Sequence, residues 1–114
     1  MVNKKQYTPD RGDLVWINLN PQKGREQANR RPAIVLSPMI YNKKSQLALM
    51  CPITSKVKGY PFEVVVRNKK IKGVILTDQI RSLDWKTREV SFIEKAGSQT
   101  LFETQEKILT LLTQ

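Results

Sequence analysis

The strongest constraint on this chain is a series of short apolar runs, several of them closed by residues that end a strand. The first run is Leu-Val-Trp-Ile-Asn-Leu at residues 14–19, and Asn20 and Pro21 close it. β-branched and aromatic residues are typical of strands, whereas Pro, Gly and Asn interrupt them. Six such runs predict six strands, at residues 14–19, 33–36, 47–53, 62–66, 73–77 and 88–93. Short strands at this spacing favour a compact, strongly bent sheet or a small barrel.

The C-terminal part of the chain changes from a strand period to a helix period. Apolar residues recur at helical spacing between residues 101 and 112. Thr100 and Glu103 match a capping box, in which hydroxyl and carboxylate each accept an N–H that the helix leaves free. The pattern predicts one amphipathic helix of about three to four turns that packs on the sheet. Within the third strand, Pro52 predicts a strand end or a bulge.

Size and charge limit the function classes. The 114 residues suit one domain over residues 1–114. Lys and Arg number 20 against 10 Asp and Glu, which gives +10 without any histidine. Either this charge is a solvated surface, or it binds a polyanion with an affinity that falls steeply with salt. No apolar run reaches the ~20 residues of a membrane span, and the N-terminus lacks the apolar region of a secretory signal. A cytoplasmic protein without a membrane partner is expected.

The single cysteine, Cys51, lies in an apolar run and is expected to be a buried core thiol. A nucleophilic thiol needs a base, and the chain has no histidine to supply one. The sequence contains no second group of ligands that would suggest a metal site. We therefore expect neither a metal nor a cofactor.

The polar segment between the first two predicted strands, residues 20–32, is longer than a plain hairpin loop. It carries Lys23, Arg25, Arg30 and Arg31 with a single acid, Glu26. Such a loop is either a solvated connection or a functional segment. The proline at position 32 favours the second reading, because it fixes the backbone where the strand begins and so holds Arg31 at the strand mouth.

Two further polar groups lie at the ends of predicted strands. Thr54 and Ser55 follow the third run, where a hydroxyl can simply bond the local backbone in an ST-turn. Asp78, Gln79 and Arg81 interrupt a strand-like stretch, and Asp78 can pair with a nearby cation for purely structural reasons. Taken alone, neither group indicates a function.

The motifs form an ordered series along the chain: Gly-Asp-Leu-Val-Trp at 12–16, Lys-Gly at 23–24, Glu-Gln at 26–27, Arg-Pro-Ala at 31–33, Val-Leu-Ser-Pro at 35–38, Pro-Ile-Thr at 52–54, Lys-Gly-Tyr-Pro-Phe-Glu-Val at 58–64 and Asp-Gln-Ile-Arg-Ser at 78–82. Each motif is weak by itself, but the series is specific. It resembles the MazF/PemK family of toxin ribonucleases, in its MazF-like branch, over nearly the whole chain.

This resemblance implies an SH3-like, CcdB-like bent β-barrel with a C-terminal α-helix, assembled as a homodimer. It implies an endoribonuclease that cuts single-stranded RNA, mainly mRNA, at short sequences and without a metal. Such a toxin inhibits translation and is neutralised by an acidic antitoxin protein. The catalytic residues implied are Arg31, Thr54 and Glu26. RNA contacts are expected from Lys23, Arg25, Arg30, Lys56, Asp78, Gln79 and Arg81.

Two positions depart from the family pattern. Asn18 stands where relatives carry an aspartate, and Arg30 stands where they often carry histidine. Both departures weaken any scheme that assigns proton transfer to these two positions. Because the sequence shows neither a metal cluster nor a protein nucleophile, attack by the RNA 2′-hydroxyl, leaving a 2′,3′-cyclic phosphate, is the economical reaction. The planar fork of Arg31 suits phosphate oxygens, and Thr54 can add a hydroxyl donor. Glu26 is the candidate base, but neighbouring arginines lower its pKa, so charge stabilisation is expected to carry more of the rate.

Two other functions are compatible with the charge. A non-catalytic RNA-binding barrel would be equally basic, and analysis of RNA ends after incubation separates it from a nuclease. A CcdB-like toxin directed at a topoisomerase would act through its C-terminal helix. Residues 108–114 look instead like a face that packs on the core.

Overall fold

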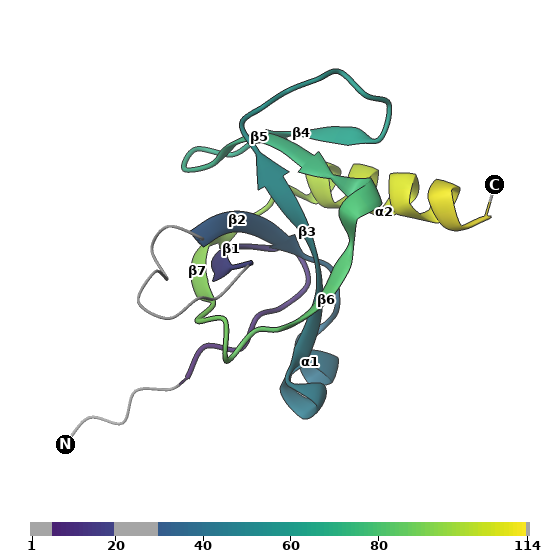
Figure 1. Ribbon diagram of the computed structural model, residues 1–114. Helices are drawn as coiled ribbons and strands as arrows, with labels where there is room; N and C mark the ends of the chain where they lie inside the picture. Colours follow the sequence, from purple (N-terminus) through teal and green to yellow (C-terminus); the bar gives the residue numbers. More distant parts are fainter. Residues whose placement is uncertain (1–5, 20–29, 114) are drawn as a thin grey trace.

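The computed structural model describes residues 6–19 and 30–113 (Figure 1). Within them lie seven strands: β1 (Asp13–Asn18), β2 (Arg30–Val35), β3 (Leu47–Thr54), β4 (Glu63–Arg67), β5 (Lys72–Leu76), β6 (Arg81–Asp84) and β7 (Ser91–Lys95). Two helices, α1 (Met39–Ser45) and α2 (Ser98–Thr113), and a 3-10 turn, η2 (Thr77–Gln79), complete the fold. Neither helix is long and apolar enough to cross a bilayer.

The strands form one curled antiparallel sheet in the order β4-β5-β3-β2-β1-β7. β3 is the strand around which the sheet bends, because it changes partner along its length. Its first half pairs with β6, its middle with β2 and its last residues with β5. Helix α2 crosses the sheet at the β4 end (Figure 1). The prediction of a mainly β fold, a bent sheet with a C-terminal helix, is confirmed.

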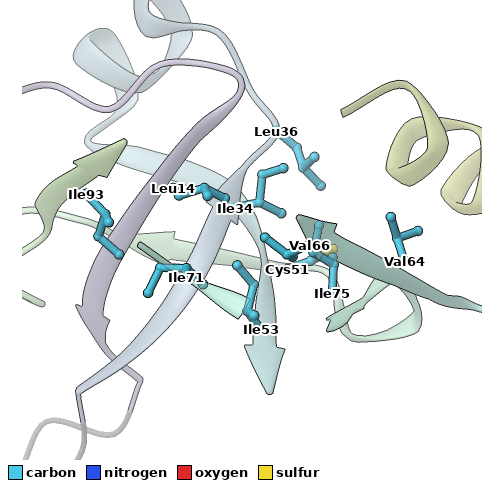
Figure 2. Close-up of a cluster of buried hydrophobic side chains, with 10 residues drawn as sticks. All are labelled: Leu14, Ile34, Leu36, Cys51, Ile53, Val64, Val66, Ile71, Ile75 and Ile93. Carbon is cyan, nitrogen blue, oxygen red and sulfur yellow. The ribbon is translucent and has the colours of Figure 1, made fainter. Parts of the chain in front are cut away.

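Both faces of the central strands are buried, which explains why the first run is almost continuously apolar. Leu14 and Ile34 lie in one core cluster, with Cys51 beside them (Figure 2). Val15 and Ala33 lie in a second cluster on the opposite face. The predicted burial of Cys51 is confirmed, with an exposed fraction of 0%. β1 and β2 therefore form a rigid frame, and the polar ends of these strands are held by it.

The predicted capping box is wrong, because α2 begins at Ser98, two residues before Thr100. The amide of Leu101 already donates to the carbonyl of Gly97 (3.1 Å), which places Thr100 inside the first turn. Thr100 is buried rather than placed at an exposed helix end. The far end of α2 also differs from the predicted core-packing face: the helix projects beyond the sheet (Figure 1), and Leu111 and Leu112 are exposed.

Four other segments differ from the predictions. Helix α1 and strand β6 were not predicted at all. The last strand begins at Ser91 rather than at residue 88, because Glu89 has a left-handed φ of 54° and belongs to the preceding turn. β3 continues past Pro52, which lies where the pairing of this strand passes from β2 to β5. A residue without an N–H is tolerated at such a point.

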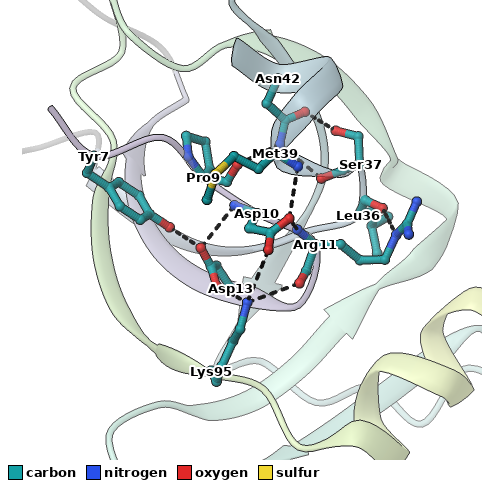
Figure 3. Close-up of polar contacts among 10 residues, drawn as sticks. All are labelled: Tyr7, Pro9, Asp10, Arg11, Asp13, Leu36, Ser37, Met39, Asn42 and Lys95. Carbon is teal, nitrogen blue, oxygen red and sulfur yellow. Dashed lines mark hydrogen bonds and ion pairs between the residues drawn. The ribbon is translucent and has the colours of Figure 1, made fainter.

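A polar network fastens the segment before β1 to the rest of the molecule (Figure 3). The buried carboxylate of Asp13 accepts hydrogen bonds from the hydroxyl of Tyr7, the amide of Asp10 (3.0 Å) and the Nζ of Lys95 (2.6 Å). Burial, together with the bond to Asp13, raises the pKa of Tyr7 well above its ordinary value. Asp10 in turn accepts the amide of Met39 at 2.8 Å, which joins this segment to α1.

Candidate nucleic-acid interface

A groove of about 640 Å³ opens where the ends of β1, β2 and β3 meet the β4–β5 hairpin and the start of β6. Its lining combines polar, apolar and cationic side chains from these five segments and from η2. The lining residues are Trp16, Leu19, Arg30, Arg31, Pro32, Pro52, Ile53, Thr54, Ser55, Lys56, Lys70, Ile71, Lys72, Leu76, Gln79 and Arg81.

The charge of the groove has one sign. Six of its lining residues are Lys or Arg, and none of the described lining residues is Asp or Glu. Cations that converge without acidic partners repel one another and attract anions from solution. A flexible polyanion such as a single nucleic-acid strand satisfies such a groove at several points at once.

Arg31 and Thr54 lie at neighbouring strand ends, and both line the groove. The pairing of β2 with β3 runs from Val35 opposite Met50 to Ala33 opposite Pro52, two residues short of Arg31 and Thr54. Arg31 is exposed, and one of its guanidinium N–H groups donates to the carbonyl of Arg30 at 3.1 Å. With five N–H donors on the guanidinium, Arg31 retains donors for a phosphate.

The two neighbouring arginines differ in how they are held. The guanidinium of Arg30 donates to the Oγ of Ser91 (2.6 Å) and to the carbonyl of Glu89 (3.3 Å). These contacts anchor Arg30 to β7 and to the turn before it. Arg30 is therefore a fixed positive charge in the groove wall, whereas Arg31 is the more adaptable of the two cations.

Thr54 makes the local contact expected of an ST-turn and still suits a role in the groove. The Oγ1 of Thr54 accepts the amide of Lys56 at 3.1 Å. Because the hydroxyl acts as an acceptor in this bond, its own proton stays available for a second partner. The turn fixes the direction of that hydroxyl at the end of β3.

Gly73 allows β5 to approach the end of β3 closely. It has a φ of 139°, and a Cβ built on it would lie 2.3 Å from the carbonyl oxygen of Thr54. This position therefore cannot accept a side chain without moving the backbone that carries Thr54. The glycine holds one wall of the groove in place.

The opposite wall, the tip of the β4–β5 hairpin, is attached to β7. The side-chain amide of Asn68 donates to the carbonyl of Lys95 (2.8 Å), and the amide of Lys70 donates to the carboxylate of Glu94 (2.9 Å). We call this pair of contacts the hairpin clamp. It joins the two ends of the curled sheet and keeps the side chains of Lys70 and Lys72 in the groove.

Of the predicted site residues that the structure describes, Arg30, Arg31, Thr54, Lys56, Gln79 and Arg81 line this groove. Asp78 does not: it is exposed outside the lining and lies near Cys51, where burial and the Asp78 charge raise the pKa of the thiol to about 12. The predicted role of Asp78 in substrate contact stays a prediction. Lys23, Arg25 and Glu26 lie outside the described residues.

The lining residues that sequence reasoning missed include Trp16, Lys70 and Lys72. The sequence shows a basic turn between β4 and β5, but it gives no sign that this turn contacts β7. Trp16 lies in an apolar run that reads as core. Asn18, at the position where the family resemblance leads us to expect an aspartate, is buried at 1% exposure, and its carbonyl accepts Nη1 of Arg88 at 3.0 Å.

Fold and groove together define a class: a small curled β-sheet protein with a cationic groove suited to a nucleic-acid strand. Comparison with known proteins gives the family. The family described as PemK-like, MazF-like toxin of type II toxin–antitoxin system matches residues 10–112, and the chain belongs to it.

Individual relatives agree with this assignment. The endoribonuclease toxin MazF of Escherichia coli K12 is 51% identical over 83 residues, which cover 73% of this chain and 75% of that protein. The crystal structure of MazF from Deinococcus radiodurans superposes with a TM-score of 0.86 at 46% identity, covering 96% of this chain and all of that one. A MazE–MazF structure from the same organism gives a TM-score of 0.85 at 42% identity, over 95% and 98% of the two chains.

Proposed function

We propose that this chain is an endoribonuclease toxin that cuts single-stranded mRNA at short sequences, without a metal, and so inhibits translation in the cytoplasm. Its family membership supports the activity, because the E. coli relative is named an endoribonuclease toxin. The observation that carries the proposal is that Arg31 and Thr54 line one groove together with five further cations and, among the described residues, no carboxylate. All of this chemistry belongs to one domain over residues 1–114.

The reaction proposed uses the RNA as its own nucleophile. The 2′-oxygen forms a bond to the adjacent phosphorus while the bond from phosphorus to the 5′-oxygen breaks. The 2′-hydroxyl loses its proton to a base, and the departing 5′-oxygen gains one. The products are a 2′,3′-cyclic phosphate and a 5′-hydroxyl end.

Arg31 and Thr54 act on the negative charge that this reaction concentrates on the phosphorus oxygens. The Arg31 guanidinium offers two parallel N–H groups to two oxygens, a geometry that a lysine cannot reproduce. The Thr54 hydroxyl adds a third donor, and its direction is fixed by the Lys56 amide. Glu26, outside the described residues, is the proposed base. The proposed RNA contacts are Lys23, Arg25, Arg30, Lys56, Gln79 and Arg81, together with Asp78, which lies outside the described groove lining.

The proposed partners are an acidic antitoxin and a second copy of this chain. An acidic segment fits the same groove as RNA, because both offer a line of negative charges to the lining cations. The D. radiodurans relative is known in a structure with MazE. Exposed apolar side chains on α1 and on the projecting end of α2, such as Ile40 (67% exposed) and Leu112 (74%), support homodimer formation.

The test is cleavage of a defined RNA by purified protein in EDTA, followed by analysis of the product ends. We expect cyclic phosphate and 5′-hydroxyl ends. We expect no cleavage where the nucleotide on the 5′ side of the scissile phosphate carries deoxyribose in place of ribose. Arg31→Ala should lower the rate by about 10²–10³-fold, the scale for one preorganised donor. Arg31→Lys should not restore it.

Arg67→Ala is the matched control, because Arg67 is an exposed strand arginine that does not line the groove. Its rate should equal that of the unmodified protein. Cleavage of the deoxyribose-substituted strand at the normal rate would refute the mechanism, and intact RNA after incubation would refute the nuclease assignment in favour of a non-catalytic RNA-binding barrel.

A further inference from the structure

Trp16 is exposed on a strand that is otherwise buried. The other five residues of β1 have exposed fractions of 0–3%, whereas Trp16 is 36% exposed. Exposing a tryptophan gives up the largest apolar burial that any side chain offers. Its neighbours Val15 and Ile17 are completely buried, so the strand is well packed at this point and the exposure of the indole is local.

The backbone of Trp16 is held from both sides. β1 lies between β2 and β7, and Trp16 is paired with Pro32 on one side and Ser91 on the other. An inner strand with partners on both sides fixes the direction in which its side chain points. Trp16 is a rigid element of the groove lining, and one with a flat apolar face.

Cations line the same groove as this indole. Pro32, the partner of Trp16, follows Arg31 directly in β2. Ser91, the partner on the other side, accepts the guanidinium of Arg30 at 2.6 Å. The indole, Arg30 and Arg31 all line the same groove, the one in which the reacting phosphate is proposed to bind.

We propose that Trp16 is a stacking platform for one nucleobase of the RNA, the base of the nucleotide next to the scissile phosphate. An aromatic ring beside phosphate-binding cations is the arrangement with which proteins bind single strands. Because every base has a π-face, this subsite fixes the position of a nucleotide without selecting its identity. The inference rests on the proposed RNA-cutting function and names a further contact for it.

Stacking on an aromatic side chain is worth about 1–3 kcal/mol per base, which corresponds to roughly 5- to 150-fold in affinity. Trp16→Ala should therefore weaken binding of an RNA made uncleavable by deoxyribose at the attacking position by that factor. Trp16→Phe keeps a smaller ring and should stay within about threefold of the unmodified protein. Phe92→Ala removes an aromatic side chain of similar exposure (49%) outside the groove and should bind normally.

Two readouts separate stacking from a structural role. The chain has two tryptophans, and the second, Trp85, is buried at 5% exposure, so quenching of indole emission on RNA binding should report on Trp16. Trp16→Phe should abolish this quenching while it retains affinity. In addition, an RNA with a single abasic nucleotide next to the scissile position should bind the unmodified protein as weakly as intact RNA binds Trp16→Ala, with no further loss when both changes are combined.

Normal affinity in Trp16→Ala, a loss in Trp16→Phe as large as in Trp16→Ala, or independent effects of the abasic site and Trp16→Ala would each overturn the stacking platform. If Arg31→Ala still abolishes cleavage in that case, the proposed function stands without it. Failure of the unmodified protein to bind or cut any single-stranded RNA would instead refute the proposed function.

Discussion

Replacing Gly73 by alanine tests whether the groove depends on the close approach of β5 to the end of β3. The added Cβ would lie 2.3 Å from the carbonyl oxygen of Thr54, whereas an ordinary contact between carbon and a carbonyl oxygen is about 3.3 Å or longer. The backbone at Thr54 therefore has to move by about 1 Å. The obstacle is main chain, so no side-chain rotation relieves it.

This displacement moves the Thr54 hydroxyl relative to Arg31. A misplacement of about 1 Å typically costs about 10²-fold in rate, so cleavage by Gly73→Ala should fall about 100-fold. Its φ of 139° adds backbone strain, which should lower the free energy of unfolding by about 1–3 kcal/mol. The protein should remain folded, because a loss of this size is smaller than the stability of a typical domain.

The assay is single-turnover cleavage of a short RNA at saturating protein, with urea unfolding measured in parallel. Gly59→Ala is the matched control: Gly59 also has a left-handed φ, 79°, but nothing lies within 4 Å of a Cβ built there. It should lose some stability and keep its cleavage rate. Unchanged cleavage in Gly73→Ala, or an equal loss in Gly59→Ala, contradicts the argument.

Lys72→Ala should weaken RNA binding about equally for all sequences and reduce the slope of log affinity against log salt by about 0.7, in titrations at several salt concentrations. The buried thiol of Cys51 should resist a thiol reagent in native protein and react in urea. Because its pKa is raised to about 12 in the fold, against 9.0 in the unfolded chain, it contributes a fall in stability as pH rises above about 9. Urea unfolding across pH 8–11 should show a shallower decline in Cys51→Ala.

Six of the seven described strands were predictable because their signal is local. Alternating or continuous apolar runs ended by Pro, Gly or Asn indicate strands whatever surrounds them. Helix α1 was not predictable, because it has seven residues, no side-chain cap and no acid in its first turn. Its stability comes from distant contacts: Asn42 donates to the carbonyl of Pro9 (2.8 Å), and the indole N–H of Trp85 donates to the carbonyl of Asn42 (3.0 Å).

The residues of the site likewise divide into those that a local sequence signal predicts and those that it does not. Arg31 and Thr54 were predictable from short motifs at strand ends, and the pairing of β2 with β3 explains why these strand ends are neighbours in the groove. Lys70 and Lys72 were not, since they reach the groove only because the hairpin tip folds back to β7. Trp16 was not predictable either, because an apolar run predicts that every one of its residues is buried. Only the folded structure shows that Trp16 lies where the core ends and is therefore exposed.

The hairpin clamp has a consequence for how such a groove can diversify. At positions 70 and 95 the clamp uses main-chain groups, the amide of Lys70 and the carbonyl of Lys95. Side chains at these two positions can therefore be exchanged without releasing it, whereas Asn68 and Glu94 contribute their side chains and cannot be exchanged freely. The contacts that hold the hairpin tip are thus independent of the side chain at position 70. The charge at this position can change to suit a different RNA while the width of the groove stays the same.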